Sequence, residues 1–278
     1  MDISDRFDIP IIVELLAKVS NVAFELNVPF FIVGATARNL VLQYGCGIRI
    51  RRATKDIDIG VRVASHDQFE SLMSALTATG DFTQEAARQR MHFRKTVQVD
   101  LIPFGGILDV EKKVVWPEGE GTELSLIGFE EAYRNALKVK VSSDPPVEVM
   151  VASATGQVLM KVLAWDERRP GTKDAIDLGV LIRTYLDVGN DLRLYEKNQD
   201  LMDTEDFDYQ VAGAYLLGRD LARLCEPETR QRVLSILDRE LKEDGDLPLV
   251  VQSADSSPQI EKTLQFWRAI RQELAEAG

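Results

Sequence analysis

The chain has 278 residues, of which 45% are hydrophobic and 28% charged, a composition typical of a globular protein. No stretch approaches the roughly 20 apolar residues of a membrane helix, and the first thirty residues resemble neither a signal nor a transit peptide. The two cysteines, Cys46 and Cys225, are far apart, which argues against a disulfide framework and a zinc site. We therefore expect a cytoplasmic protein of one large or two modest domains.

The net charge of −12 is unevenly distributed. Residues 1–104 hold 12 acidic and 12 basic residues, whereas residues 187–246 hold 16 acidic and 8 basic ones. An acidic chain is a poor general binder of nucleic acid, because that affinity depends largely on phosphate neutralisation. Two basic clusters in the neutral half could still hold a phosphate-bearing ligand. They are Arg49, Arg51, Arg52 and Lys55, and Arg88, Arg90, Arg94 and Lys95.

The first part of the chain mixes helical and strand patterns. Apolar residues at three- and four-residue spacing predict a helix over 9–26, and the apolar run 30–33 before Gly34 predicts a buried strand. Strict alternation predicts a strand over 56–63. The other predictions here are helices over 35–44 and 66–78, strands over 90–96 and 97–103, a hairpin-like stretch over 112–116, and two strands within 136–151 separated by 142–146.

After residue 153 the pattern becomes helical. Helices are predicted over 155–165, 175–185, 209–225, 228–242 and 259–277, with an acidic connector over 198–208 and a loop over 243–258. The fold class is therefore α+β. A mixed-sheet domain of residues 1–153 is followed by a C-terminal helical bundle of residues 154–278.

Three aspartates are the most informative residues. Asp56 and Asp58 lie two apart on a predicted strand, so both carboxylates point to one face, and Asp100 stands in another apolar strand. A short pattern of this kind also occurs on solvated sheet faces. Aspartate is disfavoured between apolar strand residues, however, and crowded carboxylates attract a cation. Three convergent carboxylates suit Mg²⁺, which often shares its coordination with substrate phosphates.

Two further segments could serve a phosphate ligand. Gly34 separates a predicted strand from a helix whose N-terminus could face a phosphate, although such turns are common. Downstream, Asp174 and Asp177 would share a helix face. They could equally form an acidic first turn, with Lys161 and Arg168 on a solvated face. His66 and His92 are too few for a histidine metal site, and we expect the tryptophans to be packing residues, with Trp165 close enough to Lys161 to border a base.

The order of these motifs resembles the nucleotidyltransferase superfamily of DNA polymerase β. The stretch LMKVLAWDERRPGTKDAIDLGVL resembles the corresponding segment of AbiEii-type abortive-infection nucleotidyltransferases, and the likeness covers about residues 28–182. Toxins of toxin–antitoxin pairs are common in that family, and some modify the acceptor ends of tRNA. The resemblance implies an NTP substrate and Mg²⁺ as cofactor, with two ions in the site and Mn²⁺ as a substitute.

The resemblance also implies residue roles. The catalytic and metal-binding residues would be Asp56, Asp58 and Asp100. The nucleotide-binding residues would be Gly34, Ala35, Thr36, Arg38, Lys55, Lys161, Arg168, Asp174 and Asp177. This chain departs from the family at Ala35, where a second glycine or a serine is usual, and that departure bears on the geometry of the triphosphate site.

The expected reaction is Mg²⁺-dependent transfer of a nucleoside monophosphate from an NTP to an acceptor hydroxyl. A tRNA or other RNA end is the favoured acceptor, with a cognate antitoxin as a further partner. Two alternatives remain open. The acidic C-terminal half would suit a small cationic acceptor such as an aminoglycoside, and a catalytically silent protein would bind a nucleotide or a partner without turnover.

Overall fold

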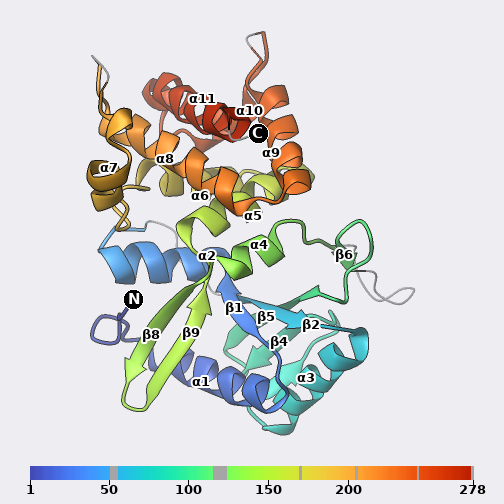
Figure 1. The fold of residues 1–278 in the computed structure, drawn as a ribbon. Helices are drawn as coiled ribbons and strands as arrows, with labels where there is room; N and C mark the ends of the chain where they lie inside the picture. The colour runs from blue at the N-terminus through green and yellow to red at the C-terminus, as the bar shows by residue number, and fades with distance from the viewer. Residues whose placement is uncertain (51–55, 115–123, 169–170, 204–205, 243, 277–278) are drawn as a thin grey trace. The chain divides into compact units, whose positions relative to one another are not determined.

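The structure is a computed structural model that describes the chain except residues 51–55, 115–123, 169–170, 204–205, 243 and 277–278. The chain forms two compact units, Met1–Ser153 and Ala154–Gly278 (Figure 1). Among the described residues, no helix has both the length and the apolar character of a membrane span.

A seven-stranded mixed sheet forms the centre of the first unit, with strand order β3-β4-β5-β2-β1-β9-β8. Strand β2 runs parallel to β5 and β1 runs parallel to β9, while the other neighbouring pairs are antiparallel. The strands are β1 Phe30–Val33, β2 Asp56–Val63, β3 Phe82–Gln84, β4 Arg90–Phe93, β5 Val97–Gly105, β8 Leu137–Ser143 and β9 Pro146–Val151. A separate two-stranded sheet pairs β6, Lys113–Val114, with β7, Leu124–Ser125.

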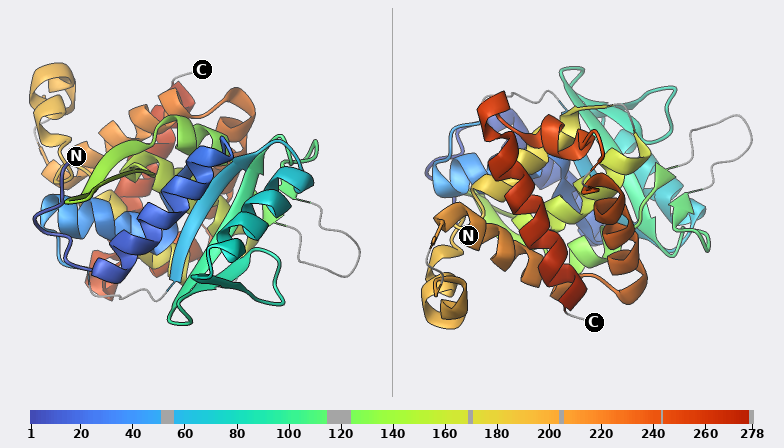
Figure 2. Two further views of the ribbon diagram at one scale, coloured as in Figure 1. Left: turned by 90° about the horizontal axis from the view of Figure 1, so that it is seen from below. Right: turned by 90° about the horizontal axis from the view of Figure 1, so that it is seen from above.

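Helices α1, Pro10–Glu25, and α3, His66–Ala78, lie over one face of this sheet (Figure 2). Their apolar stripes are buried, and so are the odd-numbered residues Ile57, Ile59 and Val61 of β2. The alternation along β2 therefore puts its apolar side chains into the core and its even-numbered residues on the opposite face. That second face carries the three aspartates.

The far part of the second face is covered by α4, Phe129–Arg134. Phe31 and Phe104 of the sheet make edge and tilted ring contacts with Phe129 and Tyr133 of this helix. A β-carbon on Gly60 would lie 2.4 Å from the Phe31 ring, so glycine at this position makes room for the ring against β2. This aromatic cluster buries the apolar part of the face, and the three aspartates lie at its other end.

The second unit is helical. Its helices are α5 Ala154–Glu167, α6 Lys173–Arg183, α7 Asp191–Lys197, α8 Tyr209–Leu224, α9 Pro227–Glu240, α10 Pro248–Ser253 and α11 Ile260–Glu276, with 3-10 turns at Gln199–Leu201 and Ser257–Gln259. The mixed sheet followed by helices confirms the predicted α+β class.

Several local predictions were wrong. The predicted loop over 243–258 contains α10, which begins at Pro248 and buries Leu249 and Val250. This helix has only 6 residues, too few for a periodic pattern. The short helices α4 and α7 were missed for the same reason. The predicted helix over 35–44 begins as α2, Gly34–Arg38, and continues as a π-helix over Asn39–Gly45.

Candidate active site

A register-matched row of side chains crosses the sheet near the start of β2. Asp58 is paired with Val33 of β1 and with Asp100 of β5, and Asp100 is paired with Arg90 of β4. Direct partners on neighbouring strands point to the same face, so Asp58, Asp100 and Arg90 stand side by side. The adjacent row holds Asp56, Gln98 and His92. The pairing of parallel strands β2 and β5 thus brings together carboxylates that are 42 residues apart in sequence, from 58 to 100.

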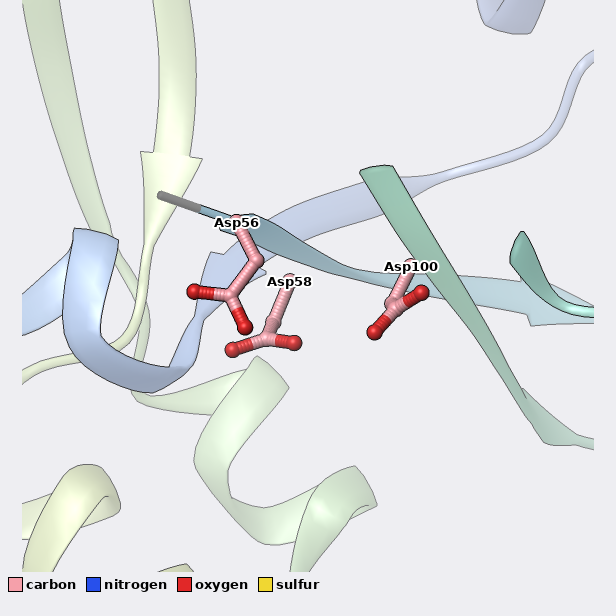
Figure 3. A group of neighbouring side chains, drawn as sticks. All are labelled: Asp56, Asp58 and Asp100. Atoms are coloured by element: carbon pink, nitrogen blue, oxygen red, sulfur yellow. The ribbon is translucent and has the colours of Figure 1, made fainter. Parts of the chain in front are cut away.

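The three aspartates converge in space (Figure 3). One carboxylate oxygen from each of Asp56, Asp58 and Asp100 lies within 4.8 Å of the others, and all three residues are partly exposed. Oxygen atoms at this spacing can be bridged by one hard divalent cation, because Mg²⁺ prefers carboxylate ligands and keeps water or phosphate in its remaining positions. The donor set therefore fits the cofactor that the sequence predicts.

Gly34 forms one wall of this carboxylate cluster. Its φ of +63° is a conformation that glycine adopts at little cost, and a β-carbon at this position would stand 2.0 Å from Oδ2 of Asp58. The backbone of the turn between β1 and α2 therefore lies directly against the Asp58 carboxylate. Any larger residue would have to displace Asp58.

The other predicted residues of the turn differ in their surroundings. The Thr36 hydroxyl donates to the backbone carbonyl of Asp56 at 3.2 Å, which ties α2 to the start of β2. Ala35 is partly exposed. Arg38 is only 1% exposed and donates to the Asn39 side chain, with Nη2 3.0 Å from Oδ1. Lys55 lies outside the described residues.

Asp100 has a cationic partner that the sequence reasoning missed. Arg90 donates from Nε to Oδ1 at 2.7 Å and from Nη2 to Oδ2 at 3.0 Å, and Gln98 adds a third donor at 3.3 Å from Oδ2. Hydrogen bonding to Asp100 raises the pKa of Arg90. The hairpin turns at residues 94–96 and pairs Phe93 with Val97, and this register places Arg90 opposite Asp100.

In the second unit, Lys161 of α5 meets both predicted aspartates of α6. Its Nζ lies 2.7 Å from Asp177 Oδ2 and 3.4 Å from Asp174 Oδ1, with the Lys161 side chain 11% exposed and that of Asp177 only 3%. The alternative of a solvated Lys161 face is therefore wrong. Arg168 does lie on a solvated face, because its side chain is 70% exposed and its Nε is 3.7 Å from Asp174.

The remaining candidate residues form ion pairs or pack in the interior. In the second basic cluster Arg88 binds Glu70, Arg90 binds Asp100, and Arg94 binds Asp81 and Glu14, so these arginines already face carboxylates. In the first cluster Arg51 and Arg52 lie outside the described residues, as does Trp116. His92 pairs with Glu85 at 2.9 Å. Trp165 and Trp267 are buried and donate to Gln252 and Ser253 respectively, as packing residues do.

A mixed sheet with a glycine turn against paired strand carboxylates is the arrangement of a nucleotidyltransferase. A family model described as the nucleotidyl transferase AbiEii toxin of a type IV toxin–antitoxin system matches residues 15–271. The match spans most of the chain, so this chain belongs to the AbiEii nucleotidyltransferase toxin family. The predicted family and enzyme class are confirmed. No curated protein sequence matches the chain.

Solved structures give weaker likenesses. The antibiotic-resistance factor ANT(2'')-Ia in solution is 16% identical with a TM-score of 0.36, over 69% of this chain and 94% of that one. Its crystal structure with adenylyl-2''-tobramycin is 16% identical with a TM-score of 0.38, over 66% and 98%. An antigenic nucleotidyltransferase-like protein from Paracoccidioides brasiliensis is 15% identical with a TM-score of 0.41, over 68% and 89%. The family assignment rests on the sequence match rather than on these scores.

Proposed function

We propose that this chain transfers a nucleoside monophosphate from an NTP to an acceptor hydroxyl, with Mg²⁺ held by Asp56, Asp58 and Asp100. The observation that carries the proposal is the convergence of these three carboxylates, with ligand oxygens within 4.8 Å of one another, beside the Gly34 turn. Residues 1–153 form the nucleotidyltransferase domain and residues 154–278 a C-terminal helical domain.

Each residue of the site has a definite task in this reaction. The acceptor oxygen forms a bond to the α-phosphorus, the bond from that phosphorus to the bridging oxygen of the β-phosphate breaks, and pyrophosphate leaves. Asp100 would lie nearest the acceptor and take up the proton of its hydroxyl; where Asp100 instead holds the ion, water would take up that proton. Asp56, Asp58 and Asp100 would hold Mg²⁺, as one or two ions, whose charge would offset that of the phosphates and of the attacking oxygen. The protein supplies orientation and charge rather than a covalent intermediate.

The nucleotide contacts follow the family resemblance. Gly34, Ala35 and Thr36 would border the phosphates through the backbone of their turn, and the resemblance assigns nucleotide contacts to Arg38 and Lys55 as well. Lys161 contacts the triphosphate, with Asp174 and Asp177 orienting its ammonium group and Arg168 at the edge of this set. The support for this second set is the short Lys161–Asp177 ion pair, which fixes the direction of a buried lysine.

The direct test is an assay with the purified protein, each of four α-labelled NTPs, Mg²⁺ and total tRNA. We expect label to enter RNA with one preferred nucleotide and pyrophosphate to be released. Asp58→Asn should abolish both. Unlabelled acceptor and no pyrophosphate with every NTP, or an Asp58→Asn variant as active as the wild type, would contradict the proposal.

The acceptor we favour is an RNA end, on the strength of the toxin family. RNA binding should weaken steeply as salt rises, and removal of Arg51 and Arg52 should reduce both the affinity and the salt slope. A small cationic acceptor is favoured instead by the excess of acidic residues over 187–246. It would be modified equally well by the Arg51→Gln/Arg52→Gln variant.

A cognate antitoxin is the partner that a type IV family implies. Co-expression with the neighbouring reading frame tests it. If that frame encodes the antitoxin, growth that stops when this chain is expressed alone should recover. The Asp58→Asn variant should not arrest growth in either case.

A further inference from the structure

Arg90 forms an ion pair with Asp100, and the proposed reaction assigns Arg90 no role. These residues are direct partners on β4 and β5, and the guanidinium group binds both carboxylate oxygens, at 2.7 and 3.0 Å. Paired donors of this kind fix the plane of a carboxylate as well as its position. The Arg90 side chain is 35% exposed and that of Asp100 is 15% exposed, so the pair stands at the edge of the site rather than in the core.

The pair also changes the charge of the site. Asp56, Asp58 and Asp100 bring three carboxylates within 4.8 Å of one another, and like charges at this spacing repel. Arg90 brings a positive charge into the row that holds Asp58 and Asp100. A divalent cation bound by these carboxylates would lie a few ångströms from that guanidinium and be repelled by it.

We propose that Arg90 is a positioning residue that sets the affinity of the site for its divalent cation. This inference rests on the proposed metal site. The two N–H donors of the guanidinium group fix the plane of the Asp100 carboxylate beside the acceptor. The positive charge of Arg90 lowers the affinity of the site for the cation. Oδ1 of Asp100 accepts from Arg90 and can still offer a lone pair to an ion, whereas Oδ2 accepts from both Arg90 and Gln98, so Arg90 and the ion can share Asp100 through Oδ1.

The two contributions can be separated by substitution. Arg90→Gln removes both the charge and the bidentate fork, whereas Arg90→Lys keeps the charge and loses the fork. A matched control is Arg62 of β2, which forms an ion pair with Glu130, with its Nε 3.1 Å from each carboxylate oxygen. Arg62→Gln removes the same charge from the same sheet, at the end that α4 covers.

The test is titration calorimetry of the full chain with Mn²⁺ alone, without nucleotide. We expect Arg90→Gln to bind Mn²⁺ roughly tenfold more tightly than the wild type, because a repelling charge is lost at close range. Arg90→Lys and Arg62→Gln should bind Mn²⁺ within about twofold of the wild type. In the transfer assay both Arg90 variants should be slower, since neither orients Asp100. A residue with a purely structural role would weaken Mn²⁺ binding when removed.

The outcomes separate this inference from the proposed function. Unchanged or weaker Mn²⁺ binding by Arg90→Gln, in a protein whose Mn²⁺ binding is lost with Asp58→Ala, overturns the role of Arg90 alone. Mn²⁺ binding that does not depend on Asp58 overturns both. Thermal unfolding of each variant verifies that the binding differences come from folded protein.

Discussion

The α-carbon of Gly34 lies against the carboxylate of Asp58, so close that an added β-carbon would stand 2.0 Å from Oδ2. This contact joins two features that the sequence shows separately, the glycine turn after the first strand and the paired aspartates of β2. It gives the glycine a second task besides its φ of +63°. The Asp58 carboxylate occupies the space that a side chain at position 34 would need.

Gly34→Ala should therefore damage the site more than the fold. The positive φ costs roughly 1 kcal/mol for alanine, and the new methyl group must also displace Asp58. A displacement of this size at reacting groups reduces transfer by roughly a hundredfold. The control is Gly80→Ala, at φ +79° with no atom within 4 Å of its added β-carbon. Equal transfer rates for the two variants would contradict the account.

The buried ion pair of the second unit gives a prediction about stability. Lys161→Met leaves Asp177, whose side chain is 3% exposed, without the ammonium group 2.7 Å away. We expect a loss of roughly 3–5 kcal/mol in the free energy of unfolding, because removing the ammonium group takes the opposite charge away from a buried carboxylate. The Lys161→Met/Asp177→Leu double variant should regain much of that loss and remain inactive.

Urea unfolding of these variants measures the effect. Arg168→Gln is the control, since its side chain is 70% exposed and 3.7 Å from Asp174, and its loss should be below about 0.5 kcal/mol. If Lys161→Met unfolds at the same urea concentration as Arg168→Gln, the ion pair does not stabilise the unit.

Alkaline pH should affect the unit through Tyr185. Its buried hydroxyl lies 2.8 Å from Thr155 Oγ1 and donates to Asp220 at 2.5 Å, and burial, with the charge of Asp220, raises its pKa. Above about pH 10 the unfolded chain releases this proton while the folded chain keeps it. The stabilisation is therefore complete below that pH and is lost progressively above it.

Tyr185→Phe should cost about 1 kcal/mol at neutral pH through its lost hydrogen bonds. The difference between wild type and variant should shrink by about 1 kcal/mol by about pH 11. Unfolding free energies across this range measure it, with Tyr195→Phe, an exposed tyrosine, as the control. A difference that stays constant with pH would show that the hydroxyl does not titrate on unfolding.

Much of the first unit could be predicted because its elements have clear periods. The alternation over Asp56–Val63 gives both the strand and the face of its carboxylates, and the apolar spacing gives α3 at His66–Ala78. Patterns of this kind report burial on one side, which is the main determinant of local structure here. The carboxylate pair could be placed on one face for the same reason.

The missed features depend on contacts between distant segments. Helix α10 is stabilised where it meets α6, and a β-carbon on Gly179 would lie 2.0 Å from the Ser253 carbonyl oxygen. Neither segment shows that approach by itself. Likewise, the Arg90–Asp100 pair depends on strand register, which a basic cluster in the sequence does not reveal.

The most direct measurement of the central claim is anomalous X-ray scattering from crystals soaked with Mn²⁺ and a non-hydrolysable NTP. We predict a strong peak within coordinating distance of Asp56, Asp58 and Asp100, shared with the triphosphate, and its loss in Asp58→Asn crystals. Loss of a ligand should weaken the site by more than the roughly 10–100-fold typical of a supporting residue. A triphosphate bound elsewhere, with no Mn²⁺ at the three aspartates, would contradict the account.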